Sequence, residues 1–248
     1  MKALILCAGL GTRLSALAED LPKPMLPLHG KPLLEYNIRY LVRHDFDQIA
    51  INLHHKPEVI QTTFGNGSAL GASIHYAFED HLLGTAGAVK NLEAFLGTEE
   101  DFLVLYGDLL VDQDLHVMLK AHREKHACAT LLLHQRERSN SLVQMDADRR
   151  ITGFLERPTE AQRRAFPFPW VNSGLQLLNR RMLDYIPANH PADLPRDVYV
   201  ATFEHERLFG YPLTGFRIAI DSPEHYRAAQ EAVRRGRYSC VAGQLDAS

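Results

Sequence analysis

Cysteine is scarce in this chain of 248 residues, and the few present lie far apart. Cys7, Cys128 and Cys240 include no pair with metal-ligand spacing, so we expect reduced thiols in a cytoplasmic protein. No stretch approaches the roughly 20 apolar residues of a membrane span. The apolar run from Ala3 to Ala8 is too short for a signal peptide. Neither a disulfide scaffold nor a membrane protein is therefore expected.

The chain also lacks a marked excess of charge of either sign. Lys and Arg number 27 and Asp and Glu number 30, which gives a net charge of −3. This balance provides no basic surface for nucleic acid, so no partner of that kind is expected. Any phosphate-binding function must come from a local site. Whether the chain forms a homo-oligomer is left open by the sequence.

What is present is an alternation of short apolar runs and amphipathic segments. In the first half, strands are predicted at residues 3–8, 48–53, 73–77 and 102–106, and helices at 32–44, 57–64, 85–96 and 115–126. This alternation predicts an α/β fold, a Rossmann-like mixed, mostly parallel sheet with helices on both faces.

The texture changes after about residue 128, where strand candidates become short and helices fewer. Strands are predicted at 129–133, 142–145, 151–155, 171–178, 208–212 and 216–220, and helices at 180–186, 196–206 and 223–235. We expect one domain over residues 1–236, divided near 127 into the halves 1–127 and 128–236. Residues 237–248 are predicted to form a loose tail.

The strongest chemical signal is a loop rich in glycine and proline that follows the first strand. It reads GLGTRLSALAEDLPKPMLPLHGKP, from Gly9 to Pro32. Glycines let backbone N–H groups turn toward an anion at close range. Arg13 adds a forked donor that suits phosphate, and Lys23 is a point charge held between two prolines. The combination predicts a phosphate-binding loop.

This loop resembles the signature GxGTRLxPLTxxxPKPMxPxxGKP of nucleoside-diphosphate-sugar pyrophosphorylases, the sugar-1-phosphate nucleotidyltransferases. It departs at Ala16, where the family usually has proline, and the resemblance extends from Met1 to about Ala232. It implies an enzyme that joins a nucleoside triphosphate to a sugar 1-phosphate with release of pyrophosphate, using Mg²⁺. The first half would bind the nucleotide and the second the sugar. The resemblance implies catalytic roles for Arg13 and Lys23, and nucleotide contacts for Gly9, Leu10, Gly11 and Thr12.

A second signal is the segment YGDLL, in which Asp108 follows a predicted strand. Ligands of open α/β sheets bind at the carboxyl ends of strands, and the resemblance implies that Asp108 is catalytic and binds the metal. The usual second ligand, the first aspartate of a DxGTP segment, corresponds here to Ala219. Asp221 is the candidate replacement, and the alternative is that it caps the helix beginning at Pro223.

A third signal is EDHLLGTAGAV, which begins at Glu79. Gly84, Thr85 and Ala86 are small enough for a flat base to approach the backbone, although Thr85 could instead cap a helix. The family uses this loop for the nucleobase, and Glu79 stands where many uridylyl- and thymidylyltransferases carry glutamine. A carboxylate accepts both the N1–H and N2–H groups of guanine. GTP is therefore favoured, with UTP as the alternative.

The sugar side is indicated by three segments of the second half. By resemblance, Glu156 in GFLERP and Asn172 in VNSG would contact sugar hydroxyls, Arg157 replaces a lysine that contacts the sugar phosphate, and Ser141 replaces a pocket glycine. The chain is most similar in its length and GTAGA loop to short guanylyltransferases for mannose 1-phosphate or D-glycero-D-manno-heptose 1-phosphate. A uridylyltransferase for a substrate such as an N-acetylmuramic acid phosphate, and a non-catalytic nucleotide-sugar-binding homologue, are the alternatives.

Overall fold

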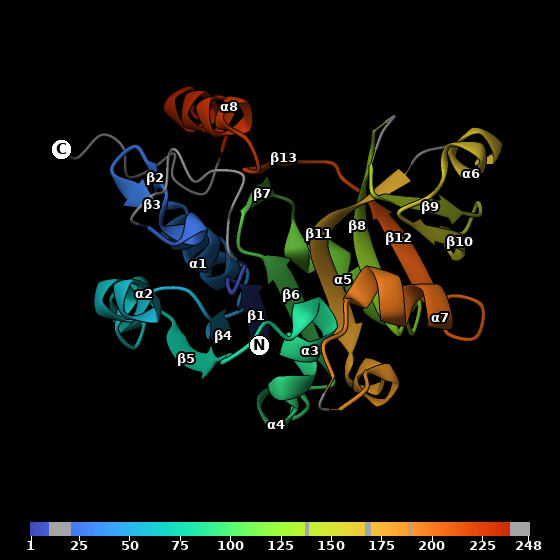
Figure 1. The fold of residues 1–248 in the computed structure, drawn as a ribbon, viewed down its shortest axis with the longest axis horizontal. Helices are drawn as coiled ribbons and strands as arrows, with labels where there is room; N and C mark the ends of the chain where they lie inside the picture. Colours follow the sequence, from blue (N-terminus) through green and yellow to red (C-terminus); the bar gives the residue numbers. More distant parts are fainter. Residues whose placement is uncertain (10–20, 137–138, 167–169, 189, 239–248) are drawn as a thin grey trace. The chain divides into compact units, whose positions relative to one another are not determined.

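A computed structural model describes residues 1–9, 21–136, 139–166, 170–188 and 190–238 (Figure 1). The chain divides into two compact units. The first unit comprises Met1–Leu82, Leu105–Asp114 and Thr214–Ser248, and the second comprises Leu83–Val104 and Leu115–Leu213. Both units are therefore discontinuous in sequence, unlike the predicted halves 1–127 and 128–236. Among the described residues, no helix has the length and apolar character needed to cross a membrane.

Three parallel strands form the sheet at the centre of the first unit. Their order is β1 (Lys2–Leu6), β4 (Gln48–Leu53) and β5 (Ser73–Phe78), with Leu6 opposite Asn52 and Asn52 opposite Ala77. The helices α1 (Leu33–Arg43) and α2 (Pro57–Phe64) lie in the connections between them. Parallel neighbours require such crossover connections, which explains the alternation seen in the sequence.

The first unit is completed by a segment from the end of the chain. Strand β7 (Leu109–Asp112) pairs antiparallel with β13 (Phe216–Ala219), and α8 (Pro223–Arg234) follows. Tyr238 is buried in the same apolar cluster as Tyr36, and the two rings meet edge to face at 5.9 Å. The packed chain thus continues into the stretch that was predicted to be a loose tail.

The second unit contains a mixed set of strands. They are β8 (Ala129–Gln135), β9 (Ser141–Met145), β10 (Ile151–Glu156), β11 (Trp170–Asn179) and β12 (Leu208–Pro212). Strand β8 pairs antiparallel with β11 and parallel with β12, and β9 pairs antiparallel with β10. The strand β6 (Asp101–Tyr106) begins in this unit and ends in the first. The predicted mixed, mostly parallel α/β fold is confirmed.

The helices of the second unit differ most from prediction. The helix expected over residues 85–96 is interrupted at Leu92, which separates α3 (Gly84–Asn91) from α4 (Glu93–Leu96). In place of the helix expected over 196–206, the π-helical turn η5 (Leu194–Tyr199) is followed by α7 (Val200–Thr202). Helix α6 (Glu160–Ala165) was missed, although Thr159 and Gln162 form the reciprocal hydrogen bonds of a capping box.

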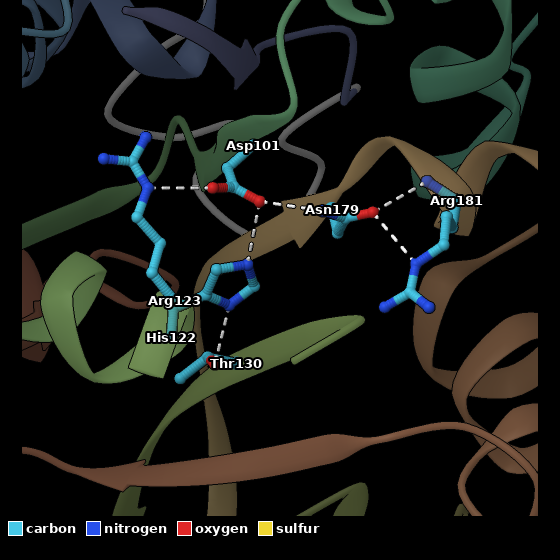
Figure 2. Close-up of polar contacts among 6 residues, drawn as sticks. All are labelled: Asp101, His122, Arg123, Thr130, Asn179 and Arg181. Carbon is cyan, nitrogen blue, oxygen red and sulfur yellow. Dashed lines mark hydrogen bonds and ion pairs between the residues drawn. The ribbon is translucent and has the colours of Figure 1, made fainter. Parts of the chain in front are cut away.

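A buried polar cluster holds the start of β6 within the second unit (Figure 2). Asp101 is only 4% exposed and accepts hydrogen bonds of 3.0 Å from both Arg123 Nε and Asn179 Nδ2. His122 Nε2, on α5 (Leu115–Glu124), lies 3.3 Å from the same carboxylate. Burial alone would raise the pKa of Asp101, but the hydrogen bonds from His122, Arg123 and Asn179 outweigh it and hold the pKa at about 2.

The same cluster contains a threonine, a histidine and an aspartate in the order of a nucleophilic triad. Thr130 Oγ1 lies 2.8 Å from His122 Nδ1, on the opposite side of the ring from Asp101. Both Thr130 and His122 are buried, at 3% and 1% exposure, and the hydroxyl lies in the core of the second unit. The cluster is a structural element rather than a catalytic one.

Candidate functional site

Two motifs that are far apart in the sequence meet in the first unit. Lys23 Nζ lies 2.6 Å from Asp108 Oδ2, across 85 residues of chain. Lys23 is flanked by Pro22 and Pro24, and it opens the short 3₁₀ helix η2 (Lys23–Met25), whose Met25 N–H donates to Pro22 O. The prolines restrict the backbone here, so the lysine is directed toward the carboxylate. The proline-clamped lysine and the aspartate of YGDLL therefore form one site.

The ladder between β7 and β13 brings a second carboxylate to this region. Ala219 is paired with Leu109, and the N–H of Ile220 donates to the carbonyl of Asp108 at 2.8 Å. Asp221 is the next residue, so its backbone lies beside the segment that carries Asp108. Strand β13 ends at Ala219, one residue earlier than predicted.

Asp221 does not cap the helix that follows it. Ser222 is the N-cap of α8, and its Oγ accepts from the N–H of His225 at 3.1 Å. The capping alternative is therefore wrong. The Asp221 carboxylate instead meets His225, with 2.5 Å between Oδ1 and Nδ1. Burial alone would raise the pKa of Asp221, but the bond and charge of His225 and the charge of Lys23 lower it below its usual value.

The donor atoms of this region fit a divalent metal ion. Asp108 and Asp221 contribute carboxylate oxygens, which are the ligands that Mg²⁺ prefers. Their side chains are 30% and 35% exposed, so the oxygens are open to a ligand from solution. Asp108 contacts the ammonium of Lys23 directly, and the charge of the same ammonium helps to lower the pKa of Asp221. The carboxylates of Asp108 and Asp221 are therefore the candidate ligands of a divalent metal ion.

A chain of hydrogen bonds joins the carboxyl ends of β1, β4 and β5. The N–H of Cys7 donates to Asn52 Oδ1 at 2.7 Å, and Asn52 Nδ2 donates to Glu79 Oε1 at 2.8 Å. The carbonyl of Glu79 lies 2.7 Å from His54 Nδ1. Sequence reasoning selected Glu79 but missed Asn52. A polar residue within the otherwise apolar run IAINL was the available signal.

The loop expected to approach the base lies in the second unit, whereas Glu79 lies in the first. A side chain on Gly84 would meet the carbonyl of Ala192 at 2.5 Å, and the φ of Gly84 is +73°. Thr85 Oγ1 accepts from the N–H of Leu194 at 2.8 Å and does not cap α3, whose N-cap is Leu83. The small residues, including Ala86, therefore have a packing role, and their contact with a base stays a prediction.

The sugar-side residues share one face of the sheet in the second unit. Ser141 and Glu156 are directly opposite each other on β9 and β10, and their side chains are hydrogen bonded. Trp170 of β11 is opposite Val143, and Asn172 is two residues further on. Because side chains alternate with period two, Asn172 lies on the same face as Ser141 and Glu156.

Arg157, the remaining sugar-side residue, follows β10 and is exposed. Its φ of +49° is uncommon for a residue with a side chain. Leu10, Gly11, Thr12 and Arg13 lie outside the described residues, and Gly9 is the last described residue before them.

Comparison with known proteins shows which family the chain belongs to. A protein-family model described as "Nucleotidyl transferase" matches residues 2–213. The chain belongs to the nucleotidyl transferase family. A D-glycero-alpha-D-manno-heptose 1-phosphate guanylyltransferase of Aneurinibacillus thermoaerophilus is 32% identical to this nucleotidyl transferase, over 94% of this chain and 99% of the relative. The predicted family is thus confirmed.

Two further similarities concern a second relative and the fold. A UTP–glucose-1-phosphate uridylyltransferase of Synechocystis sp. is 35% identical over 80% of this chain, but this chain spans only 54% of that relative's length. The crystal structure of HddC from Yersinia pseudotuberculosis superposes with a TM-score of 0.78 at 23% identity, covering 94% of this chain and 99% of that one. Nucleotidyl transferases generally use a divalent metal, which the carboxylates of Asp108 and Asp221 fit.

Proposed function

We propose that this nucleotidyl transferase joins a nucleoside triphosphate, preferably GTP, to a sugar 1-phosphate and releases pyrophosphate. The observation that carries the proposal is the meeting of Lys23 with Asp108 beside Asp221, at the end of β6. Ligands of open α/β sheets bind at such carboxyl ends. The family membership and the guanylyltransferase relative support the same reaction class.

The reaction is an in-line displacement at the α-phosphorus by an oxygen of the sugar phosphate. That oxygen is already ionised near neutral pH, so the protein needs no general base and acts by alignment and charge neutralisation. Asp108 and Asp221 would hold Mg²⁺, which supplies positive charge to the triphosphate oxygens when it is bound. Lys23 offsets charge at the α-phosphate, and Arg13 offsets charge on the departing pyrophosphate.

The second unit would supply the sugar side of the reaction. Glu156, Asn172 and Ser141 share a face of its sheet, and Glu156 and Asn172 offer acceptors for sugar hydroxyls. Arg157 would meet the sugar phosphate, in a fork geometry that differs from that of the lysine it replaces. We propose that residues 1–127 bind the nucleotide and that residues 128–236 bind the sugar.

The runner-up is a uridylyltransferase, and the Synechocystis relative supports it. Glu79 favours GTP instead, because a carboxylate can accept both guanine donors. The loss of the usual aspartate at Ala219 is the observation in favour of a non-catalytic homologue. The position of Asp221 beside the Asp108 segment argues against that alternative.

A pyrophosphate-release assay tests the proposal. GTP, UTP, CTP, ATP and dTTP are each combined with the 1-phosphates of mannose, D-glycero-D-manno-heptose, glucose and N-acetylmuramic acid in the presence of Mg²⁺. We expect the highest rate with GTP and a guanylyltransferase substrate, and loss of activity with EDTA. Dominance of UTP would establish the runner-up. No release with any pair would contradict catalysis altogether.

A further inference from the structure

The amide of Asn52 is oriented by its two partners. A backbone N–H can only donate, so the atom that faces Cys7 N at 2.7 Å must be the oxygen of Asn52. The nitrogen then faces Glu79 Oε1 at 2.8 Å, and that oxygen must accept. Cys7, Asn52 and Glu79 are 6%, 4% and 5% exposed, so solvent competes little for these bonds. The direction of hydrogen bonding along the chain is therefore fixed.

Asn52 also occupies a central position among the strands of the first unit. It lies on β4, opposite Leu6 on one neighbouring strand and Ala77 on the other. Cys7 and Glu79 are the residues that directly follow β1 and β5. Cys7 leads into the glycine-rich segment, and Glu79 begins the segment predicted to meet the base. The Asn52 side chain therefore connects the starts of two segments with separate predicted tasks.

We propose that Asn52 is a positioning residue that determines which hydrogen-bonding group position 79 presents to the nucleobase. By donating to Oε1, Asn52 holds the Glu79 side chain in one orientation, in which the opposite carboxylate oxygen is presented to guanine as an acceptor. By accepting from Cys7, it fixes the same orientation relative to the start of the glycine-rich segment. This inference rests on the proposed function, in which Glu79 reads the base.

The proposal makes a specific statement about an amide at position 79. In a Glu79→Gln variant, Asn52 still donates, so it would select the oxygen of the new amide and turn the NH₂ group toward the base. That group is a donor, which suits the carbonyl oxygens of uracil and opposes the N–H groups of guanine. If position 52 accepted instead, it would select the NH₂ group and turn the oxygen back toward the base.

The double variant N52D/E79Q produces this reversal. The carboxylate introduced at position 52 can still accept from the N–H of Cys7, and its second oxygen can accept from the NH₂ group introduced at position 79. The two hydrogen bonds of Asn52 described above are thus kept, with the polarity of one reversed. The single variant N52D instead places two carboxylates against each other, which is unfavourable. Asn179→Asp is a matched control, because Asn179 Nδ2 donates to the Asp101 carboxylate at 3.0 Å in the second unit.

The experiment measures the dissociation constants of GTP and UTP and the melting temperature for these variants. We expect E79Q to lower the preference for GTP over UTP roughly tenfold, because a donor replaces the acceptor that faces guanine, at nearly unchanged Tm. N52D/E79Q should recover a preference for GTP several-fold above that of E79Q. N52D and the control N179D should both melt lower, but only N52D should change the base preference.

The outcomes separate this inference from the proposed function. A double variant that melts like the wild type but prefers GTP no more than E79Q would overturn the positioning role of Asn52. An unchanged preference in E79Q would overturn it as well, since position 79 would then not read the base. Turnover of GTP and a sugar 1-phosphate by the wild-type enzyme, assayed alongside the variants, would show that the proposed reaction stands in either case.

Discussion

An aspartate lies near each end of β6, and the two have different surroundings. Asp101 opens the strand, is 4% exposed and is bonded to His122, Arg123 and Asn179. Asp108 follows the strand, is 30% exposed and is paired with the ammonium of Lys23 alone among the ion pairs of the described residues. A carboxylate saturated by fixed protein donors stabilises the fold. A partly exposed carboxylate balanced by one cation remains available to a ligand. From this contrast we infer that the second end of β6 is the one that takes part in catalysis.

The largest effect is expected at the exposed end. Asp108→Asn keeps the size of the side chain but removes its charge, so the turnover number should fall on the order of a hundredfold or more. Its Tm should stay near that of the wild type, because Asp108 is not part of the buried polar cluster around Asp101. Near-wild-type kcat at saturating Mg²⁺ would remove Asp108 from the catalytic site.

Lys23→Ala tests the cation that is paired with Asp108 at the exposed end of β6. If Lys23 meets charge that develops in the transition state, kcat should fall roughly tenfold to a hundredfold while KM for GTP changes little. Lys31→Ala is the matched control, since Lys31 lies in the same proline-rich region but pairs with Glu35 at 3.8 Å. A rise in KM alone would make Lys23 a ground-state binder.

Asp101→Asn should act on stability rather than on turnover. It removes a buried charge that interacts with His122, Arg123 and Asn179, and we expect a loss of about 2 kcal/mol in the free energy of unfolding, measured by urea denaturation. Arg123→Ala should cost less, because the Arg123 side chain is 56% exposed. A loss of kcat in folded D101N as large as that in D108N would contradict the contrast between the two ends.

The same aspartate predicts a pH dependence. The pKa of Asp101 is held at about 2, below the ordinary value of about 3.9. A lowered pKa in the folded state gives stability that is present above about pH 4 and is lost as the pH falls toward 2. The difference in unfolding free energy between wild type and D101N should therefore shrink over that interval. A constant difference would show that the charge of Asp101 is not involved.

Asp221→Asn is expected to have the smallest effect. It should raise the Mg²⁺ concentration needed for half-maximal activity by several-fold, because one of two carboxylate ligands loses its charge. Ala219→Asp restores the residue that the family usually has and should be tolerated. An unchanged Mg²⁺ requirement in D221N, with the protein still active, would remove Asp221 from the metal site.

The sequence predicted those parts of the fold and of the candidate site that depend on residues adjacent in the chain. The apolar run Ala3–Ala8 and the glycine that follows it indicated a buried parallel strand, and PKP with YGDLL indicated two charged groups of one site. It missed β7, because LLVD follows the previous strand across the two-residue turn Gly107–Asp108 and its partner β13 is distant in the sequence. Asn52 was missed because its role depends on Cys7 and Glu79, which are brought to it by strand pairing alone.

The contrast between the two aspartates can be tested directly by metal binding. The affinity for Mn²⁺, followed by the EPR signal of the free ion, is compared for wild type, D108N and D101N, each saturated with a non-hydrolysable GTP analogue. We predict that D108N binds the ion at least roughly tenfold more weakly, while folded D101N binds it like the wild type. Equal Mn²⁺ affinity of D108N and wild type would contradict the account.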